Sequence, residues 1–193
     1  MEKKTLGVKQ LITVGIFTAL YLIVFFVCGM LGYIPIIYAI LPLLAPVLCG
    51  IPYMLFLTRV DRFGMVSILS LLCGLFMFLT GHTFVPLVTA VVTGVAADLI
   101  FKAGKYKSRK LSVVGYVVSA LWILGAMLPF FIMRDRFYQM MIDSMTLEYT
   151  ETVFELFDKL AWTFPIMSIV GGVIGAFLGF AALKKHFKKA GIA

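Results

Sequence analysis

The amino-acid sequence predicts an all-α integral membrane protein, a six-transmembrane-helix bundle with an additional outer amphipathic helix between helices five and six. Two observations lead to this prediction. First, 62% of the 193 residues are hydrophobic and 13% are charged, whereas a soluble domain has about 45–50% apolar and about 25% charged residues. Second, the charged residues gather in short clusters between long stretches that hold almost none, as in chains that cross a bilayer.

Six stretches are apolar and long enough, or nearly so, to cross a membrane as helices. A helix rises about 1.5 Å per residue, so about 20 residues span a hydrocarbon core of about 30 Å. The expected spans cover residues 11–31, 34–57, 63–80, 84–101, 111–133 and 161–183, all in a single membrane domain, residues 1–193.

The second span contains four prolines, namely Pro35, Pro42, Pro46 and Pro52. Proline removes a backbone hydrogen bond and bends a helix. In lipid, the freed carbonyl groups are tolerated only where protein or a cavity satisfies them. We therefore expect a bent second helix that faces the interior of the bundle, where a ligand pocket could form.

The basic residues predict the orientation of the chain. Apart from Arg134, Arg136 and Lys159, every Lys and Arg lies in the N-terminal segment, in residues 59–62 or 102–110, or in the C-terminal tail. Short cytoplasmic loops retain Lys and Arg. The sequence thus predicts a multi-pass membrane protein with N-in and C-in topology. It also explains the net charge of +8 without a nucleic-acid partner, because the basic residues flank apolar spans.

The outer segment, residues 134–160, carries six of the nine acidic residues and is too polar to span. Its second half is amphipathic, with Val153, Phe154 and Phe157 on one side and acidic residues on the other. Thr152 and Glu155 fit a capping box at the start of this helix. The helix is expected to lie on the outer membrane surface or to cover the mouth of the bundle; the alternative is a solvated loop with a short helix.

The spans contain almost no group that could perform catalysis. Asp98 is the one ionisable residue within a predicted span, and it could form an ion pair with Lys102, cap a helix, or serve as a proton or ion site. The chain has no HExxH, GxSxG or Walker A motif. The sequence therefore predicts no enzyme, no catalytic residue, no metal site and no cofactor in this chain. Cys28, Cys49 and Cys73 are expected to be buried free thiols.

Candidate substrate-binding residues lie at the outer turns: Tyr33, Tyr38, His82 and Thr83. The two tyrosines, like Trp122 and Trp162, are interpreted as interfacial anchors or as the rim of an outward-facing pocket. His82 is either structural or a substrate contact. Four methionines (Met133, Met140, Met141 and Met145) precede the amphipathic helix, where adaptable apolar contact is favoured over metal ligation.

Small residues at helical spacing predict close helix packing. Gly171, Gly175 and Gly179 mark the sixth span as an internal packing helix. Gly15 and Ala19 form a similar pair on the first span, which could pack internally or against another protein.

The whole chain resembles the substrate-binding S component of an energy-coupling factor (ECF) transporter, and is most similar to the Trep_Strep or MptD-like group. The strings that carry the resemblance are MEKKTLGVKQLITVGIFTALY, YIPIIYAILPLLAP and VAADLIFKAGKYKS. The resemblance implies docking through Gly15 and Ala19 on a transmembrane T component, where glycine replaces the usual first alanine. It also implies an outer pocket near Tyr33 and His82.

The resemblance further implies a location in the bacterial cytoplasmic (plasma) membrane and separate roles for this chain and its partners. The chain would capture a small-molecule substrate, such as a vitamin, a metal ion or an iron-linked ligand (a siderophore or haem), while two ABC-type ATPases use the ATP. Alternatives are a stand-alone secondary transporter or channel, which should show ionisable residues along a pathway or an internal repeat, and a non-transporting membrane assembly protein. A membrane enzyme would need at least two polar catalytic groups at one depth, and Asp98 alone does not meet this requirement.

Overall fold

The computed structural model describes residues 6–187, which form helices and the turns between them and contain no strand. The elements are α1 (Val8–Met30), η1 (Leu31–Tyr33), α2 (Pro35–Leu57), α3 (Met65–Leu79), α4 (Val85–Ala103), α5 (Arg109–Ala120), η2 (Leu121–Ile123), α6 (Leu124–Met127), α7 (Pro129–Ile132), α8 (Arg134–Ser144), α9 (Leu147–Leu160), η3 (Ala161–Thr163), α10 (Phe164–Ala182) and η4 (Leu183–Phe187).

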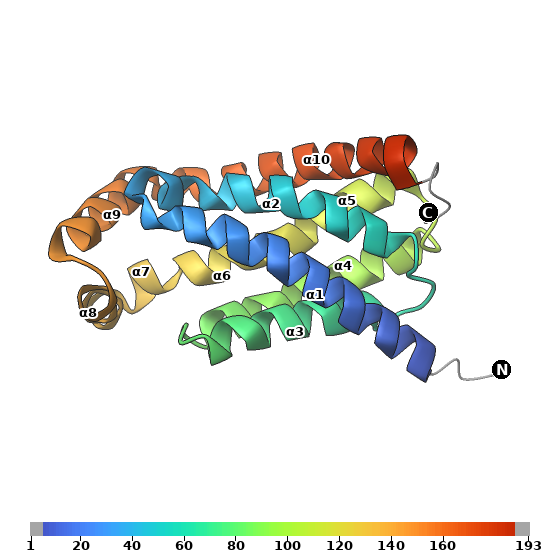
Figure 1. The fold of residues 1–193 in the computed structure, drawn as a ribbon, viewed down its shortest axis with the longest axis horizontal. Helices are drawn as coiled ribbons and strands as arrows, with labels where there is room; N and C mark the ends of the chain where they lie inside the picture. Colours follow the sequence, from blue (N-terminus) through green and yellow to red (C-terminus); the bar gives the residue numbers. More distant parts are fainter. Residues whose placement is uncertain (1–5, 188–193) are drawn as a thin grey trace.

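Most of the helices run along the long axis of the molecule (Figure 1). These are α1, α2, α3, α4, the broken segment from α5 to α7, and α10. The short helices α8 and α9 lie across one end. Helix α1 begins and α10 ends at the opposite end of the bundle.

Five helical segments are long and apolar enough to cross a membrane: Val8–Tyr33, Pro35–Leu57, Val85–Ala103, Arg109–Ile132 and Leu147–Lys185. The expected third span, residues 63–80, is the shorter apolar helix α3, which has 15 residues. At about 1.5 Å per residue, such a helix covers roughly 22 Å, less than the hydrocarbon core. The expected fifth span also differs from a regular helix, because it is interrupted by the 3₁₀ turn η2.

Helix α2 lies in the interior and is the most buried of these five segments. It stays helical from Pro35 to Leu57 with three prolines inside it. Its main partner is α10, which presents Gly171, Gly175 and Gly179 to it. A Cβ atom on Gly175 would overlap the carbonyl oxygen of Pro46 on α2. The absence of side chains at these glycines lets the two backbones approach closely.

The helices α7, α8 and α9 meet in an aromatic cluster around Phe130, which is fully buried. The ring of Phe130 lies 4.5 Å from Phe137 on α8 and 5.0 Å from Phe154 and 4.0 Å from Phe157 on α9, between ring centroids. Phe157 also stacks on Tyr38 of α2. Because aromatic side chains bury large areas, this cluster fixes α8 and α9 on the end of the bundle.

The expected start of the amphipathic helix was wrong. Helix α9 begins at Leu147, and the hydroxyl of Thr146 accepts a hydrogen bond from the backbone N–H of Tyr149. Thr152 lies inside the helix, and its hydroxyl donates to the carbonyl of Glu148. The buried face of α9 includes Val153, Phe154 and Phe157, the apolar side predicted from the sequence. The outer segment is therefore two helices, and its second helix covers the end of the bundle.

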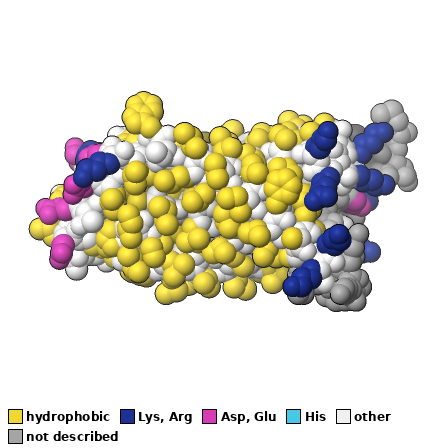
Figure 2. Space-filling model, turned by 90° about the horizontal axis from the view of Figure 1, so that it is seen from above, with side chains coloured by type: hydrophobic (Ala, Val, Ile, Leu, Met, Phe, Trp, Pro, Cys, Tyr) yellow, Lys and Arg dark blue, Asp and Glu magenta, His cyan; other side chains and the backbone are white. Residues whose placement is uncertain are grey.

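Lys and Arg gather at one end of the bundle, and Asp and Glu, with fewer Lys and Arg, gather at the other (Figure 2). We call the end with the start of α1 and the end of α10 the basic end; its described basic residues are Lys9, Arg59, Arg62, Lys102, Lys105, Lys107, Arg109, Lys110, Lys184 and Lys185. The end formed by α8 and α9 is the acidic end, with Asp135, Asp143, Glu148, Glu151, Glu155 and Asp158. A hydrophobic surface separates them (Figure 2).

Candidate functional site: a cavity at the acidic end

A cavity of about 480 Å³ lies at the acidic end of the bundle. We call it the end cavity. Residues from the last turns of α1 and α3 line one side, and residues of α8 and Tyr149 of α9 line another. Further lining residues come from the broken segment (Ile123, Ala126 and Met127) and from α2 (Tyr38, Leu41 and Ala45). The cavity therefore forms only when the ends of several separate helices come together.

The lining is apolar, aromatic and rich in sulfur. Six of the eleven methionines line it: Met30, Met77, Met127, Met140, Met141 and Met145. The aromatic lining residues are Phe25, Phe26, Tyr33, Tyr38, Phe76, Phe137 and Tyr149. The polar side chains besides the tyrosines are Thr80, His82 and Ser144, and no Lys, Arg, Asp or Glu is among these described lining residues. The site thus favours apolar contact over charge pairing.

Three of the four predicted binding residues, Tyr33, Tyr38 and His82, line the end cavity. Thr83 follows His82 in the chain but is not among the lining residues; its buried hydroxyl has no partner within the described part of the chain. Tyr149 is a lining residue that the sequence did not single out. Its position at the start of an amphipathic helix gave no signal, because only the docking of α9 brings it to the cavity.

His82 provides the imidazole in the cavity wall. Its backbone N–H donates to the carbonyl of Met77, and its Nδ1 lies 3.4 Å from the hydroxyl oxygen of Thr80. The turn that carries it requires Gly81, whose φ of +94° suits a residue without a Cβ atom. Burial lowers the pKa of His82 below its ordinary value, because desolvation disfavours the charged ring. Desolvation thus favours the uncharged ring, which can both donate and accept a hydrogen bond.

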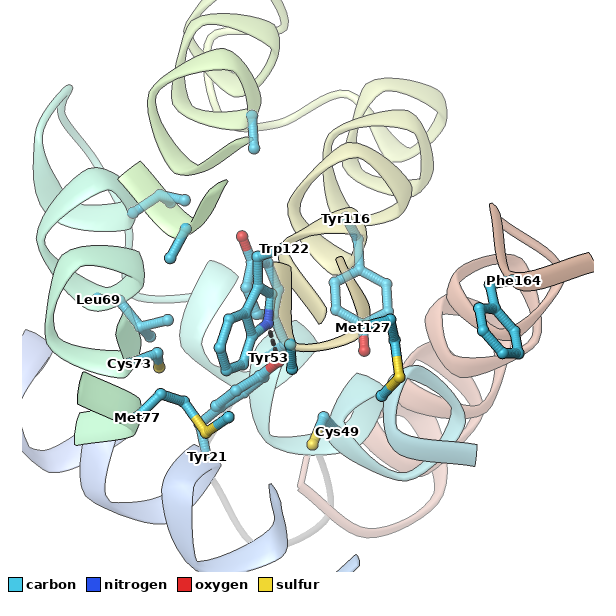
Figure 3. Packing of buried hydrophobic residues seen from close by; sticks show 14 of the residues in the cluster. Tyr21, Cys49, Tyr53, Leu69, Cys73, Met77, Tyr116, Trp122, Met127 and Phe164 are labelled. Atoms are coloured by element: carbon cyan, nitrogen blue, oxygen red, sulfur yellow. Dashed lines mark hydrogen bonds between the residues drawn. The ribbon is translucent and has the colours of Figure 1, made fainter. Parts of the chain in front are cut away.

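Figure 3 shows large buried side chains packed together in the interior of the bundle, among them Tyr21 and Trp122. Trp122 Nε1 donates a 3.1 Å hydrogen bond to the hydroxyl of Tyr21, which joins η2 to α1. Phe25, which lines the cavity, packs on Trp122 with 4.9 Å between ring centroids. The expectation that Trp122 is an interfacial anchor was wrong, since it is 4% exposed and its indole is used inside the bundle, whereas Trp162 is 90% exposed.

Two polar contacts connect the elements of the acidic end. The hydroxyl of Tyr149 donates a hydrogen bond to the carbonyl oxygen of Gly32, which joins α9 to the turn after α1. Arg134 at the start of α8 makes two parallel hydrogen bonds of 2.8 Å to the carboxylate of Asp158 on α9. The guanidinium of Arg134 also lies 5.0 Å from the ring centroid of Phe154. These contacts hold α8 and α9 beside the cavity.

Asp98 lies away from the end cavity and caps a helix. It is fully buried on α4 and accepts hydrogen bonds from the backbone N–H groups of Gly64 and Ser67 at the start of α3. Tyr106 donates a further hydrogen bond of 3.2 Å to it. Lys102, four residues on, instead places its Nζ 5.4 Å from the centroid of Phe63. The contacts of Asp98 are those of a structural cap, one of the roles that the sequence left open.

The predicted docking pair, Gly15 and Ala19, lies on the exposed side of α1. Nothing lies within 4 Å of a Cβ atom built on Gly15. The exposed residues around the pair include Ile12 and Ile16. Gly15 thus makes no close helix contact within the described chain, and packing against another protein stays a prediction. The three cysteines are free and buried, as predicted.

The fold and the apolar surface between two charged ends define a helical integral membrane protein. The chain belongs to the Trep_Strep family, described as hypothetical bacterial integral membrane proteins, whose family model matches residues 8–189. The match covers nearly the whole chain. Comparison with curated proteins and with solved structures found no match.

Proposed function

We propose that this protein is the substrate-capture (S) component of an ECF-type importer. The observation that carries the proposal is the arrangement of two features on one bundle: a ligand-sized cavity at the acidic end, and an exposed strip of small residues, Gly15 and Ala19, on α1. A capture subunit needs both a binding site and a surface for its partner.

The proposed orientation places the basic end in the cytoplasm, because Lys and Arg are retained on that side. The end cavity then opens toward the outside, where a scarce nutrient must be captured. In this orientation the six helical segments, with α3 as the short one, cross the membrane and leave both termini inside. The chain itself would hydrolyse nothing; the ATP would be used by two ABC-type ATPases bound through the T component.

The exposed strip on α1 supports partner binding through its shape. Small residues allow another helix to approach the backbone closely, and in lipid such packing is a main source of helix association. A transmembrane helix of the T component would fill the space left open beside Gly15. Larger side chains at Gly15 and Ala19 would prevent this approach without disturbing the bundle.

The test is affinity purification of the tagged protein from its native membranes in mild detergent, with mass spectrometry of the partners. We expect one transmembrane protein and two ATPases with the wild type, and their loss from the double variant Gly15→Leu, Ala19→Leu. Ala181→Leu is the matched control, since it enlarges an exposed small residue on α10. A chain that purifies alone, under conditions that preserve a known complex from the same cells, would contradict the proposal.

A further inference from the structure

The chemistry of the end cavity limits what it can bind. Its volume of about 480 Å³ falls in the range of roughly 300–1,000 Å³ that small organic ligands occupy. A bare metal ion with a few ligating atoms would leave most of this space empty. The volume of the cavity therefore suits an organic molecule better than a metal ion.

The lining also selects for ligand charge. A charged group that leaves water must be paired with an opposite charge or be held by several hydrogen bonds. No acidic or basic side chain is among the described residues that line the end cavity. Arg134 and Asp158 bind each other through two hydrogen bonds, so neither charge is left to pair with a ligand. A ligand carrying a net charge would enter this site without compensation.

The aromatic and methionine side chains of the walls favour a ligand with an aromatic group. Phe25, Tyr38, Phe137 and Tyr149 present rings to the cavity, and rings pack favourably face to face or edge to face. The thioethers of Met127 and of the α8 methionines are polarizable and adapt to the edge of a ring. Thr80 and His82 add hydrogen-bonding groups on one side, which would orient a ligand with one polar end.

We propose that the end cavity binds a neutral, predominantly apolar molecule with at least one aromatic ring. Methionine and aromatic side chains contact this molecule, and a hydrogen bond with His82 orients it. This inference rests on the proposed function in one respect: it takes the cavity as the substrate site of a capture subunit. It deepens that function by excluding ionised nutrients and free metal ions as substrates.

Photolabelling with benzophenone tests the proposal, because benzophenone is neutral and aromatic and its excited state inserts preferentially at methionine. The full-length protein would be reconstituted in lipid nanodiscs, labelled, digested and mapped by mass spectrometry. We expect saturable labelling at Met140, Met141 and Met145, and little at Met167, a half-buried methionine on α10 that does not line the cavity. The anionic analogue 4-benzoylbenzoate should label the cavity about tenfold less, as expected if burying its carboxylate is disfavoured.

A pair of variants on α1 locates the labelling. Gly29 lines the cavity and has no atom within 4 Å of a built Cβ, whereas Ile23 is 61% exposed and does not line it. Gly29→Trp should fill the cavity and reduce labelling about tenfold, whereas Ile23→Trp should leave it unchanged. Thermal unfolding of both variants would verify that they are folded.

Three outcomes would overturn the inference: equal labelling of Met167, which indicates partition into lipid; labelling that Gly29→Trp does not reduce; and labelling by 4-benzoylbenzoate at least as strong as by benzophenone. A failure of the proposed function can be told apart from a failure of the proposed ligand class. Cavity labelling without co-purifying partners would reject the S component and keep the ligand class, whereas partners that co-purify with a chain showing no cavity labelling would reject the ligand class alone.

Discussion

Ser67 on α3 donates two hydrogen bonds to one carboxylate oxygen of Asp98 on α4, from its backbone N–H at 3.1 Å and from its hydroxyl at 2.9 Å. The same oxygen accepts from the N–H of Gly64 at 2.8 Å. A negative group at a helix N-terminus satisfies N–H groups that have no partner within the helix and interacts favourably with the helix dipole. Asp98 is thus the cap of α3, supplied by a different helix.

Removal of this cap should destabilise the protein. Asp98→Ala leaves buried donors unsatisfied, which costs about 1–3 kcal/mol. Asp98→Asn keeps an acceptor oxygen and should lose less. Thermal unfolding in detergent, followed by intrinsic fluorescence, would measure both. Asp61→Asn is the control, since its side chain is 57% exposed. Unfolding of Asp98→Ala at the wild-type temperature would contradict the capping role.

The contact between α2 and α10 predicts opposite effects of the same substitution at two glycines. Gly175→Ala places a methyl group against the carbonyl of Pro46 and should destabilise by about 1–3 kcal/mol, as overpacking does. Gly15→Ala meets open space and should stabilise by about 0.5–1 kcal/mol, since alanine favours the helix. Unfolding temperatures of the two variants compare them directly; a loss of stability for Gly15→Ala would contradict the exposed position of α1.

The aromatic cluster predicts that Phe130 stabilises the acidic end. Phe130→Ala removes a fully buried ring and should cost about 3–5 kcal/mol. Phe131→Ala, at a neighbouring residue that is 40% exposed, should change stability far less. Hydrogen exchange would show where the loss occurs, with faster exchange in α8 and α9 expected for Phe130→Ala. Equal losses of stability for the two substitutions would argue against a stabilising role of the aromatic cluster.

The start of α9 gives a direct test between two capping residues. Thr146→Ala removes the hydroxyl that accepts from Tyr149 and should cost about 0.5–2 kcal/mol. Thr152→Ala, at an exposed position inside the helix, should have little effect. The free energy of unfolding of each variant would show which threonine caps the helix. A larger loss of stability for Thr152→Ala than for Thr146→Ala would favour the capping box that the sequence suggested.

The pair between Arg134 and Asp158 predicts a dependence on pH. The hydrogen bonds from Arg134 hold the pKa of Asp158 below its ordinary value of 3.8. A depressed pKa in the folded state gives stability that is present above pH 4 and is lost as the pH falls through the lower, folded value. Both side chains are about half exposed, so the contribution is about 0–1 kcal/mol.

Hydrogen exchange of α8 at pH 5 and near pH 3, in Asp158→Asn beside the wild type, would measure this effect. We expect the wild type to lose the protection of α8 at the lower pH after correction for the intrinsic exchange rate. The variant should show the weaker protection at both values. A wild type and a variant with the same pH profile would exclude a role for the pair.

Local features of the sequence were enough to place the long apolar helices approximately and to predict the two faces of α9. Long apolar stretches have few alternatives to a helix in lipid, because every backbone polar group must be satisfied within the segment. The α2 helix consequently begins within one residue of the predicted start and ends at the predicted residue. The acidic and apolar faces of α9 follow from helical periodicity in the same way. The capping box failed because a Thr-x-x-Glu pattern also occurs inside helices.

The sequence by itself determined that this chain is a helical membrane protein with basic and acidic ends, since hydropathy and charge clustering are properties of the chain alone. Only the tertiary structure decided where the cavity lies and what lines it. Phe25, Met127, Met141 and Tyr149 come from different helices, and no spacing along the chain relates them. The burial of Trp122 and the cap that Asp98 provides likewise depend on which helices become neighbours, because each contact is made by two elements that only packing brings together.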